Sequence, residues 1–180
     1  MMIRTSRLLL RPAFPEDSRE MFAAINEQAL VRMLVRAPWP YLPEYAEEYC
    51  AAPLDPLAMR FVIALPTERG APIVGMIGIG AGEGGELSLG YWIAQSWRRR
   101  GFASEAVGAV LDAAAMLGYR EVGASHWLDN PASGKVLAAC GFAETGEVRP
   151  ANCLGRGGEL VLARRYSCDL RERAWMRVAA

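Results

Sequence analysis

The sequence predicts a single mixed α+β domain whose central sheet is mostly antiparallel and is flanked by helices. Three β-rich runs follow one another in the middle of the chain, separated by turns rich in glycine and proline. The clearest helical periodicity follows directly, over residues 101–117. Beyond it, the order strand, helix, late strand indicates that one pair of strands is parallel, because such a connection needs a crossover.

Length and composition limit the class of protein. A chain of 180 residues fits one domain, which we assign to residues 1–170 with a loosely tethered tail at 171–180. Hydrophobic residues make up 52% and charged residues 22%, which is ordinary globular usage and excludes a disordered chain. Twenty basic residues balance twenty acidic ones, so no overall field favours nucleic acid or an anionic membrane.

The cysteines predict free thiols in a reducing compartment. They are widely spaced, and the chain has one histidine, so no zinc-site spacing occurs and we expect no metal. The N-terminus lacks the apolar stretch of a signal peptide, and no run is long enough to span a membrane. We therefore expect a cytoplasmic protein.

The first third of the chain is predicted to alternate strand and helix. Leu8–Pro12 is a short strand, and Pro15–Asp17 opens a helical stretch with apolar positions up to Met33. The proline-rich segment Ala37–Pro43 predicts an irregular loop, and a short helix is expected near Glu44–Cys50.

The middle of the chain predicts three antiparallel strands. Phe61–Leu65 and Ile73–Ile79 form a hairpin through the turn at 66–72, and Glu86–Ile93 is the third strand. The intervening Gly80–Gly85 matches GxGxxG, but that dinucleotide fingerprint must open a helix, and here a strand pattern follows. We read it as a hairpin turn, which argues against a nicotinamide-dependent redox enzyme.

The second half predicts a helix over Gly101–Leu117 with Gly118 near its C-cap, a strand over Glu121–Leu128 and a helix over Pro131–Cys140. A late strand is expected at Glu159–Cys168.

A basic turn directly before the long helix is a candidate phosphate site. It consists of Arg98, Arg99, Arg100, Gly101, Phe102 and Ala103. The first turn of a helix has unpaired N–H groups and the positive end of the helix dipole, and small residues let a pyrophosphate approach the backbone. A solvated basic turn is the alternative interpretation.

Several motifs in this order resemble the GNAT N-acetyltransferases, in particular the branch of RimJ and RimL ribosomal-protein N-terminal acetyltransferases. The motifs are Gly90-Tyr91-Trp92, Trp97, Arg98-x-x-Gly101-x-Ala103, Asp129-Asn130-x-x-Ser133-x-x-Val136-Leu137 and Gly141-Phe142. Weaker likeness extends to Thr5-x-Arg7-Leu8-x-Leu10-Arg11 and Trp39-Pro40. The resemblance covers most of the chain.

The resemblance implies the GNAT fold, in which the sheet splays open between the fourth and fifth strands and acetyl-CoA enters the gap. Those strands would be Glu86–Ile93 and Glu121–Leu128. Backbone groups near Ile93 and Ala94 would pair with the pantetheine arm, and residues from Arg98 to Ser104 would bind the pyrophosphate. The family also suggests a homodimer.

Asn130 and Ser133 are predicted at the start of a helix, where this branch contacts the cofactor arm near its sulfur. Both residue types are also favoured helix caps, so Asn130 is either a cap or a CoA ligand. Ser133 is the candidate that protonates the departing thiolate. Many relatives use a tyrosine for that step, and this sequence has Leu137 in the corresponding place.

The general base is less clear from the sequence. Relatives often carry a glutamate at the position of Ser88, so Glu86, two residues earlier, is a candidate that would act through water or else a solvated turn residue. His126 suits proton transfer near neutral pH, although a lone histidine in a strand is more often a packed residue. Aromatic residues that could line an acceptor pocket are Trp39, Tyr41, Trp92 and Trp127.

Together these features predict transfer of acetyl from acetyl-CoA to a primary amine, with a protein or peptide N-terminus as the expected acceptor. Two alternatives remain. The acceptor could be a small molecule such as an antibiotic, polyamine or amino acid, but a polycation should need several carboxylates, and only Glu44, Glu47, Glu48 and Glu86 are candidates. The chain could also be a CoA-binding sensor without turnover, because Ser88 and Leu137 replace two usual catalytic residues.

Overall fold

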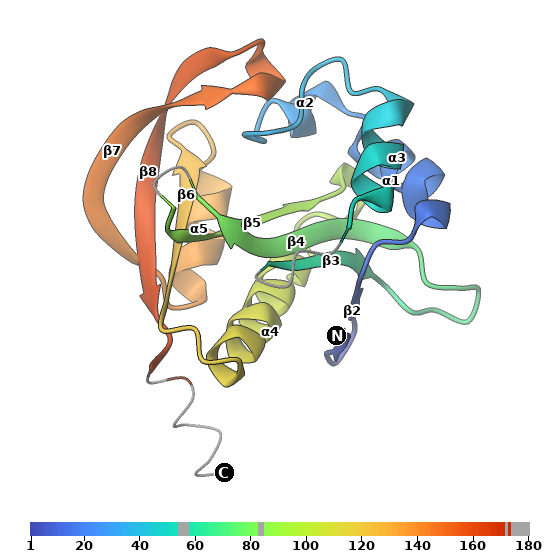
Figure 1. Cartoon of the computed structure of the whole chain (residues 1–180), viewed down its shortest axis with the longest axis horizontal. Helices are drawn as coiled ribbons and strands as arrows, with labels where there is room; N and C mark the ends of the chain where they lie inside the picture. Colours follow the sequence, from blue (N-terminus) through green and yellow to red (C-terminus); the bar gives the residue numbers. More distant parts are fainter. Residues whose placement is uncertain (54–57, 83–84, 172, 174–180) are drawn as a thin grey trace.

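The computed structural model describes residues 1–53, 58–82, 85–171 and 173. Within these residues, eight strands form one sheet in the order β1-β2-β3-β4-β5-β6-β8-β7 (Figure 1). The pairs are antiparallel except for β5 and β6, which are parallel. The predicted sheet is therefore confirmed, including its single parallel pair.

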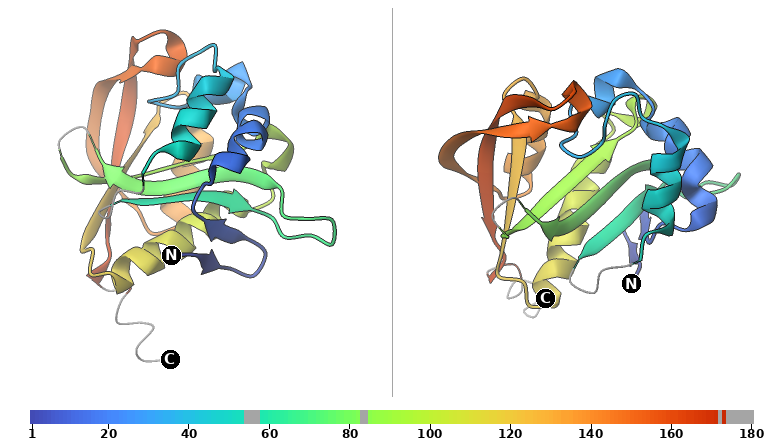
Figure 2. Two further views of the ribbon diagram at one scale, coloured as in Figure 1. Left: turned by 45° about the vertical axis from the view of Figure 1, so that its right-hand side comes forward. Right: turned by 45° about the horizontal axis from the view of Figure 1, so that its top comes forward.

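Helices cover both faces of this sheet (Figures 1 and 2). On one face lie α1 (Ser18–Ile25), α2 (Gln28–Val31) and α3 (Pro43–Ala51), preceded by the 3-10 turn η1 (Pro15–Asp17), and on the other lie α4 (Phe102–Met116) and α5 (Pro131–Ala139). The N-terminal strands β1 (Ile3–Arg4) and β2 (Leu9–Arg11) form one edge of the sheet.

The central strands are buried on both faces, because side chains alternate along a strand. In β3 (Met59–Ala64), Phe61 and Ile63 pack with α4, whereas Val62 packs with Met21 of α1. The hairpin partner β4 (Ile73–Ala81) carries a register shift opposite Ile63 and Ala64; beyond it, the strand alternates regularly, with Ile77 and Ile79 toward α4 and Met76 toward α1. Because β3 and β4 contribute side chains to a core on each face of the sheet, each strand is a nearly continuous apolar run.

The two strands of the parallel pair diverge soon after they meet. β5 (Leu87–Ile93) and β6 (Glu121–Trp127) are joined at only Ser88↔Gly123 and Leu89↔Ala124, although each strand has seven residues. β5 remains paired with β4 up to Ile93, and β6 remains paired with β8 up to Trp127. The sheet thus opens between β5 and β6, as the family resemblance implied, and a 3-10 turn, η2 (Gln95–Trp97), leads from β5 to α4.

One element of the first half differs from the prediction, and a second agrees with it. The helical stretch beginning at Pro15 breaks after Ile25, because Asn26 leaves the helical backbone region with ψ 62° and its N–H bonds to Phe22 O. The predicted hairpin turn at Gly80–Gly85 is flanked by antiparallel strands with Ala81 opposite Leu87; residues 83–84 lie outside the described part.

The last third contains a strand that the sequence did not predict. β7 (Ala143–Cys153) pairs with β8 (Glu159–Asp169) at the edge of the sheet, with the 3-10 turn η3 (Leu154–Arg156) between them. Most of β7 is exposed and polar, so it lacks the apolar alternation that marks a strand. Its signal in the sequence is therefore weak.

Of the predicted tail, the structure describes only residues 171 and 173. Arg173 donates to Asp112 Oδ1 at 3.1 Å and to Cys140 O at 2.6 Å, which ties it to α4 and to the end of α5. The rest of the tail lies outside the described residues. Among the described helices, none is both long and apolar enough to cross a membrane.

Candidate active site

A cavity of about 1400 Å³ passes through the opening in the sheet. One end is lined by the turn before α4 and by residues of β5, β6 and α5. The other end is lined by α1, α3 and the segment after α2. The cavity thus joins the predicted phosphate turn to the face of the sheet that carries α1 and α3, which is the face opposite α4.

The turn before α4 has an unusual backbone that opens it toward the cavity. Arg98 is extended, and both Arg99 (φ 60°) and Gly101 (φ 80°) are left-handed. Gly101 is the N-cap of α4 and has no side chain to bond the first N–H groups of the helix. Alternating backbone conformations of this kind direct successive N–H groups to one side, which suits an anion.

The predicted pyrophosphate residues do not all face the same way. Arg98, Arg99 and Gly101 line the cavity, and so do Phe102, Ala103 and Ser104. Arg100 is directed elsewhere, since its guanidinium lies 4.8 Å from the Trp97 ring centroid and donates to Ser96 O.

The N-terminal segment braces this turn through Glu105, in the first turn of α4. The Glu105 carboxylate accepts hydrogen bonds from the Thr5 and Ser6 hydroxyls and from the backbone and guanidinium of Arg7. Burial opposes ionisation, but these bonds outweigh it and lower the pKa of Glu105 to about 2. Arg7 also donates to Arg100 O at 2.9 Å and lies over the Phe102 ring, so the segment fixes the shape of the turn.

The gap-facing backbone of β5 favours Ile93 over Ala94 as a contact for an extended ligand. Ala94 N–H donates to Val74 O, and Ala94 O accepts from Trp97 N, both at 2.9 Å. Successive residues of a strand direct their backbone groups to opposite sides, so those of Tyr91 and Ile93 point away from β4 and toward the gap. Arg98 Nε donates to Ile93 O at 3.1 Å from that side.

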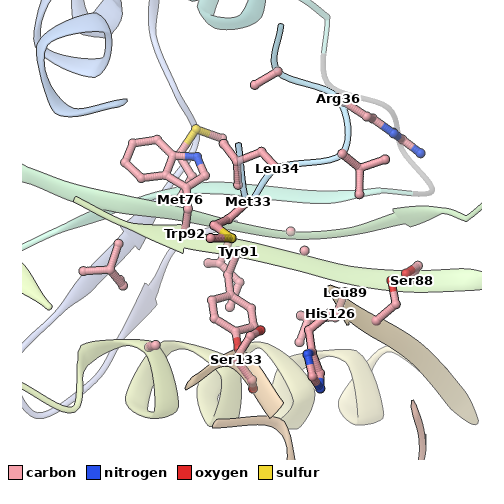
Figure 3. A pocket seen from close by; sticks show the side chains of 18 of the residues that line it. Met33, Leu34, Arg36, Met76, Ser88, Leu89, Tyr91, Trp92, His126 and Ser133 are labelled. Carbon is pink, nitrogen blue, oxygen red and sulfur yellow. Dashed lines mark hydrogen bonds between the residues drawn. The ribbon is translucent and has the colours of Figure 1, made fainter. Parts of the chain in front are cut away.

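Two hydroxyl groups meet across the gap. Tyr91 projects from β5, and its hydroxyl lies 2.9 Å from Ser133 Oγ and 3.2 Å from Ser133 O (Figure 3). Burial raises the pKa of Tyr91 to about 12, so the phenol stays protonated at neutral pH. Sequence reasoning missed Tyr91 as a site residue, since no spacing links it to a serine 42 positions away.

Asn130 and Ser133 do not act as side-chain caps of α5. Asn130 occupies the N-cap position but its side chain forms no capping bond; its carbonyl accepts from Ser133 N instead. Both residues line the cavity. The capping interpretation is therefore wrong for this structure, and capping does not explain why these two residues line the cavity.

His126 lines the cavity from β6, yet both of its ring nitrogens have protein partners. Nδ1 lies 2.8 Å from Trp127 O, and Nε2 lies 3.3 Å from the Tyr166 hydroxyl, which also contacts Glu144. Gly134 of α5 makes room for this arrangement, since a Cβ there would lie 2.6 Å from His126 Nε2. The geometry resembles the packed histidine more than a base poised toward the cavity.

The candidate base Glu86, just before β5, and the family base position Ser88, on β5, line the same cavity. Glu86 lines the cavity and forms an ion pair with Arg165 of β8. Ser88, two residues on, faces the cavity beside Leu89 and His126 (Figure 3). Within the described residues no group of histidine, cysteine, aspartate and glutamate side chains is arranged to hold a metal ion.

Aromatic side chains line the end of the cavity remote from α4. Tyr41, Trp92 and Trp127 line it as predicted, together with Tyr45 and Tyr49 of α3. Trp39 is not among the lining residues and packs instead in the cluster around Leu30 and Tyr41.

Comparison with protein families decides the class. The model of the acetyltransferase (GNAT) domain matches residues 7–143, which is most of the chain. The protein belongs to this GNAT family. The predicted class of enzyme, an acetyl-CoA-dependent N-acetyltransferase, is confirmed at the level of the family.

Solved structures agree with this GNAT fold. The chain is similar to the microcin C7 self-immunity acetyltransferase MccE in complex with acetyl-CoA and AMP, with TM-score 0.78 and 16% identity over 92% of this chain and 93% of that one. It is also similar to RimL, the ribosomal L7/L12 α-N-protein acetyltransferase, in complex with CoA, with TM-score 0.77 and 20% identity over 94% and 98%.

A third GNAT structure has a different acceptor. The spermidine N-acetyltransferase from Vibrio cholerae in complex with CoA and spermine matches with TM-score 0.75 and 19% identity over 94% and 99% of the two chains. A search of curated proteins gives no significant match. The neighbours thus agree on the GNAT fold and differ in the amine that their names give.

Proposed function

We propose that this GNAT protein transfers the acetyl group of acetyl-CoA to a primary amine, the α-amino group of a peptide or protein. One observation carries the proposal: a single cavity joins an uncapped helix N-terminus, an opened pair of strands and the Tyr91–Ser133 hydroxyl pair. Acetyl-CoA supplies an activated thioester. Four free, buried cysteines fit a reducing cytoplasm as its setting.

The residues present fit the donor. The backbone N–H groups at the start of α4 would hold the pyrophosphate, with Arg98 and Arg99 adding charge from the cavity wall. Ile93 would offer its gap-facing N–H to the pantetheine arm. Asn130, which lines the cavity and is not engaged in capping, would bond the arm from the opposite side of the gap.

Ser133 would protonate the sulfur as the thioester breaks, with Tyr91 as its support. Tyr91 stays protonated at neutral pH, so its hydroxyl can donate to Ser133 Oγ while the serine hydroxyl donates into the cavity. Tyr91 would thus supply a second hydroxyl at the site, whereas Leu137 is 1% exposed and packs in the core.

Proton removal from the amine has two remaining candidates. Glu86 is a carboxylate of the cavity wall that could accept the proton through water, although it also holds Arg165. His126 would first have to release Trp127 O or Tyr166. Glu86 and His126 both stay candidates for the base, and positioning of the two substrates would supply most of the rate enhancement.

Thiol release from acetyl-CoA tests the proposal, measured over a panel of peptides and small amines. Ser133→Ala should lower kcat by about 100-fold, the scale of general acid catalysis, with little change in the Kd for CoA. Ser96→Ala, on the exposed turn before Arg98, is the matched control and should keep the wild-type rate.

Two results would contradict the proposal. Equal rates for Ser133→Ala and wild type would reduce Ser133 to a structural residue. CoA binding without thiol release with any amine would identify the chain as a sensor that has lost turnover.

A further inference from the structure

The acceptor end of the cavity has an unusual floor. In the sheet, Arg60 of β3 lies opposite Gly78 of β4, which lies opposite Gly90 of β5. A Cβ at Gly90 would meet nothing within 4 Å, so the floor there is open space rather than packed sheet. In this row, Arg60 is the residue that contributes a side chain to the cavity.

Arg60 is poorly explained as a structural residue. Its Nη2 donates to Ala52 O at 2.7 Å and its guanidinium lies 4.6 Å from the Tyr49 ring centroid. Its Nε is buried without a hydrogen-bond partner, and Nη1 has no acceptor among the described residues. No carboxylate of the described chain lies within ion-pair distance of it. A buried N–H without an acceptor costs free energy, so the Nε of this partly buried arginine is not explained by packing alone.

The charges around the cavity also bear on the role of Arg60. Among the described residues, the charged side chains that line the cavity are six arginines and two glutamates: Arg36, Arg60, Arg98, Arg99, Arg149, Arg165, Glu48 and Glu86. Arg98 and Arg99 belong to the donor end, Arg165 is paired with Glu86, and Arg149 with Glu147.

Two arginines remain at the acceptor end without a carboxylate partner in the described chain. They are Arg60 and Arg36, whose Nη2 contacts Ala81 O at 2.7 Å. Among the described lining residues, the exposed Glu48 is the carboxylate that opposes them. A cationic acceptor such as a polyamine would be repelled, and an anionic one attracted.

We propose that the acceptor amine carries an oxyanion, bound by Arg60 at the Tyr49 end of the cavity with Arg36 adding to the field. This inference rests on the proposed acetyl transfer. Arg60 and Gly90 are two strand spacings apart, about 10 Å, which is the span of about three extended residues. The guanidinium lies at Ala52 O and the Tyr49 ring, so an amine that lies over Gly90 would place the acidic group at the second or third residue of a peptide acceptor.

Peptide amides with one variable position test this assignment. The position is the second or the third, and it holds glutamate, glutamine or lysine in an otherwise alanine sequence. The wild-type enzyme should show a KM at least tenfold lower for glutamate than for glutamine, and higher still for lysine. Alanyl-alanine with a free carboxylate, compared with its amide, distinguishes a small amino acid from an acidic side chain as the source of the oxyanion.

Arg60→Met keeps the aliphatic stem and removes the charge. It should abolish the preference for glutamate by raising the KM of that peptide at least tenfold. The KM of the glutamine peptide and the Kd for CoA should stay close to their wild-type values. Arg60→Lys should retain the preference in part. Arg69→Met, on an exposed turn away from the cavity, is the matched control and should behave as wild type.

The outcomes separate the two proposals. Equal KM for glutamate and glutamine peptides in the wild-type enzyme, or a preference for lysine peptides or spermine, would overturn the role of Arg60. If no amine releases thiol, acetyl transfer fails, and the Kd of the same peptides for the CoA-bound protein then decides for or against the oxyanion site. The wild-type comparison needs no variant, so a variant that does not fold leaves the test intact.

Discussion

Gly101 offers the sharpest test of the pyrophosphate site, because its conformation and its position can be separated. With φ 80° it caps α4 in the left-handed region, and an added Cβ would lie 3.3 Å from Arg7 Nη2. Gly118, at the other end of the same helix, has φ 88° and no atom within 4 Å of an added Cβ. Gly118→Val therefore reproduces the backbone strain of Gly101→Val without touching the phosphate turn.

Both variants should lose stability to a similar degree in the absence of ligand. A branched residue held in the left-handed region costs about 1–3 kcal/mol. For a domain of this size, each kcal/mol lowers Tm by about 2–4 °C. We therefore expect the two unliganded proteins to melt at temperatures about 2–12 °C below that of the wild type.

CoA should distinguish the two variants. At a ligand concentration of 100 Kd, binding stabilises the wild type by about 2.7 kcal/mol, a Tm rise of about 5–11 °C. If Gly101→Val weakens CoA tenfold, the same concentration gives about 1.4 kcal/mol, a rise of about 3–6 °C. Gly118→Val should keep the full rise. Thermal melts with and without CoA measure this difference. A rise in Tm of Gly101→Val as large as that of the wild type would refute pyrophosphate binding at this turn.

Three further substitutions test the surroundings of the site. Glu105→Gln removes a carboxylate whose pKa is about 2 in the folded protein, against a reference value of 4.5. The ionised carboxylate therefore stabilises the fold above pH 4.5, and this stabilisation is lost as the pH falls toward 2. The difference in Tm between wild type and variant should shrink over that range. Tyr91→Phe should lower kcat less than Ser133→Ala does and leave the Kd for CoA unchanged. A kcat below that of Ser133→Ala in stopped thiol-release assays would make Tyr91, rather than Ser133, the proton donor. Leu137→Ala should lower the free energy of unfolding by about 2–5 kcal/mol in urea titrations, since the side chain is 1% exposed, and a change below 1 kcal/mol would contradict its place in the core.

Elements with strong local patterns could be predicted from the sequence. The helix α4 buries Val107, Val110, Leu111 and Ala114 on one periodic face, and the β3–β4 hairpin is bounded by turn residues. The polar edge strand β7 has no such pattern, since pairing with β8 holds it in the sheet rather than burial of alternate side chains. A strand defined by its partner leaves little trace in its own residues.

The catalytic end of the cavity shows a different limit. Asn130 and Ser133 have residue types that favour helix caps, and local propensity alone would assign them that role. In the structure the Ser133 hydroxyl is used by Tyr91 from another strand, and the cap is formed by a backbone carbonyl. Only the tertiary fold reveals this competition, because the two hydroxyls are far apart in sequence.

The donor and acceptor halves of the cavity therefore differ in how far the sequence discloses them. The proposed donor site is one continuous turn, where backbone geometry and a helix N-terminus lie within a few residues of Gly101. The acceptor end combines α1, α3 and three strands, so its charge depends on which arginines already have partners. Arg165 is neutralised by Glu86 and Arg60 is not, a distinction that net charge conceals. In this chain, therefore, the proposed donor site can be read from local sequence, whereas the charge at the proposed acceptor end depends on pairing between distant side chains.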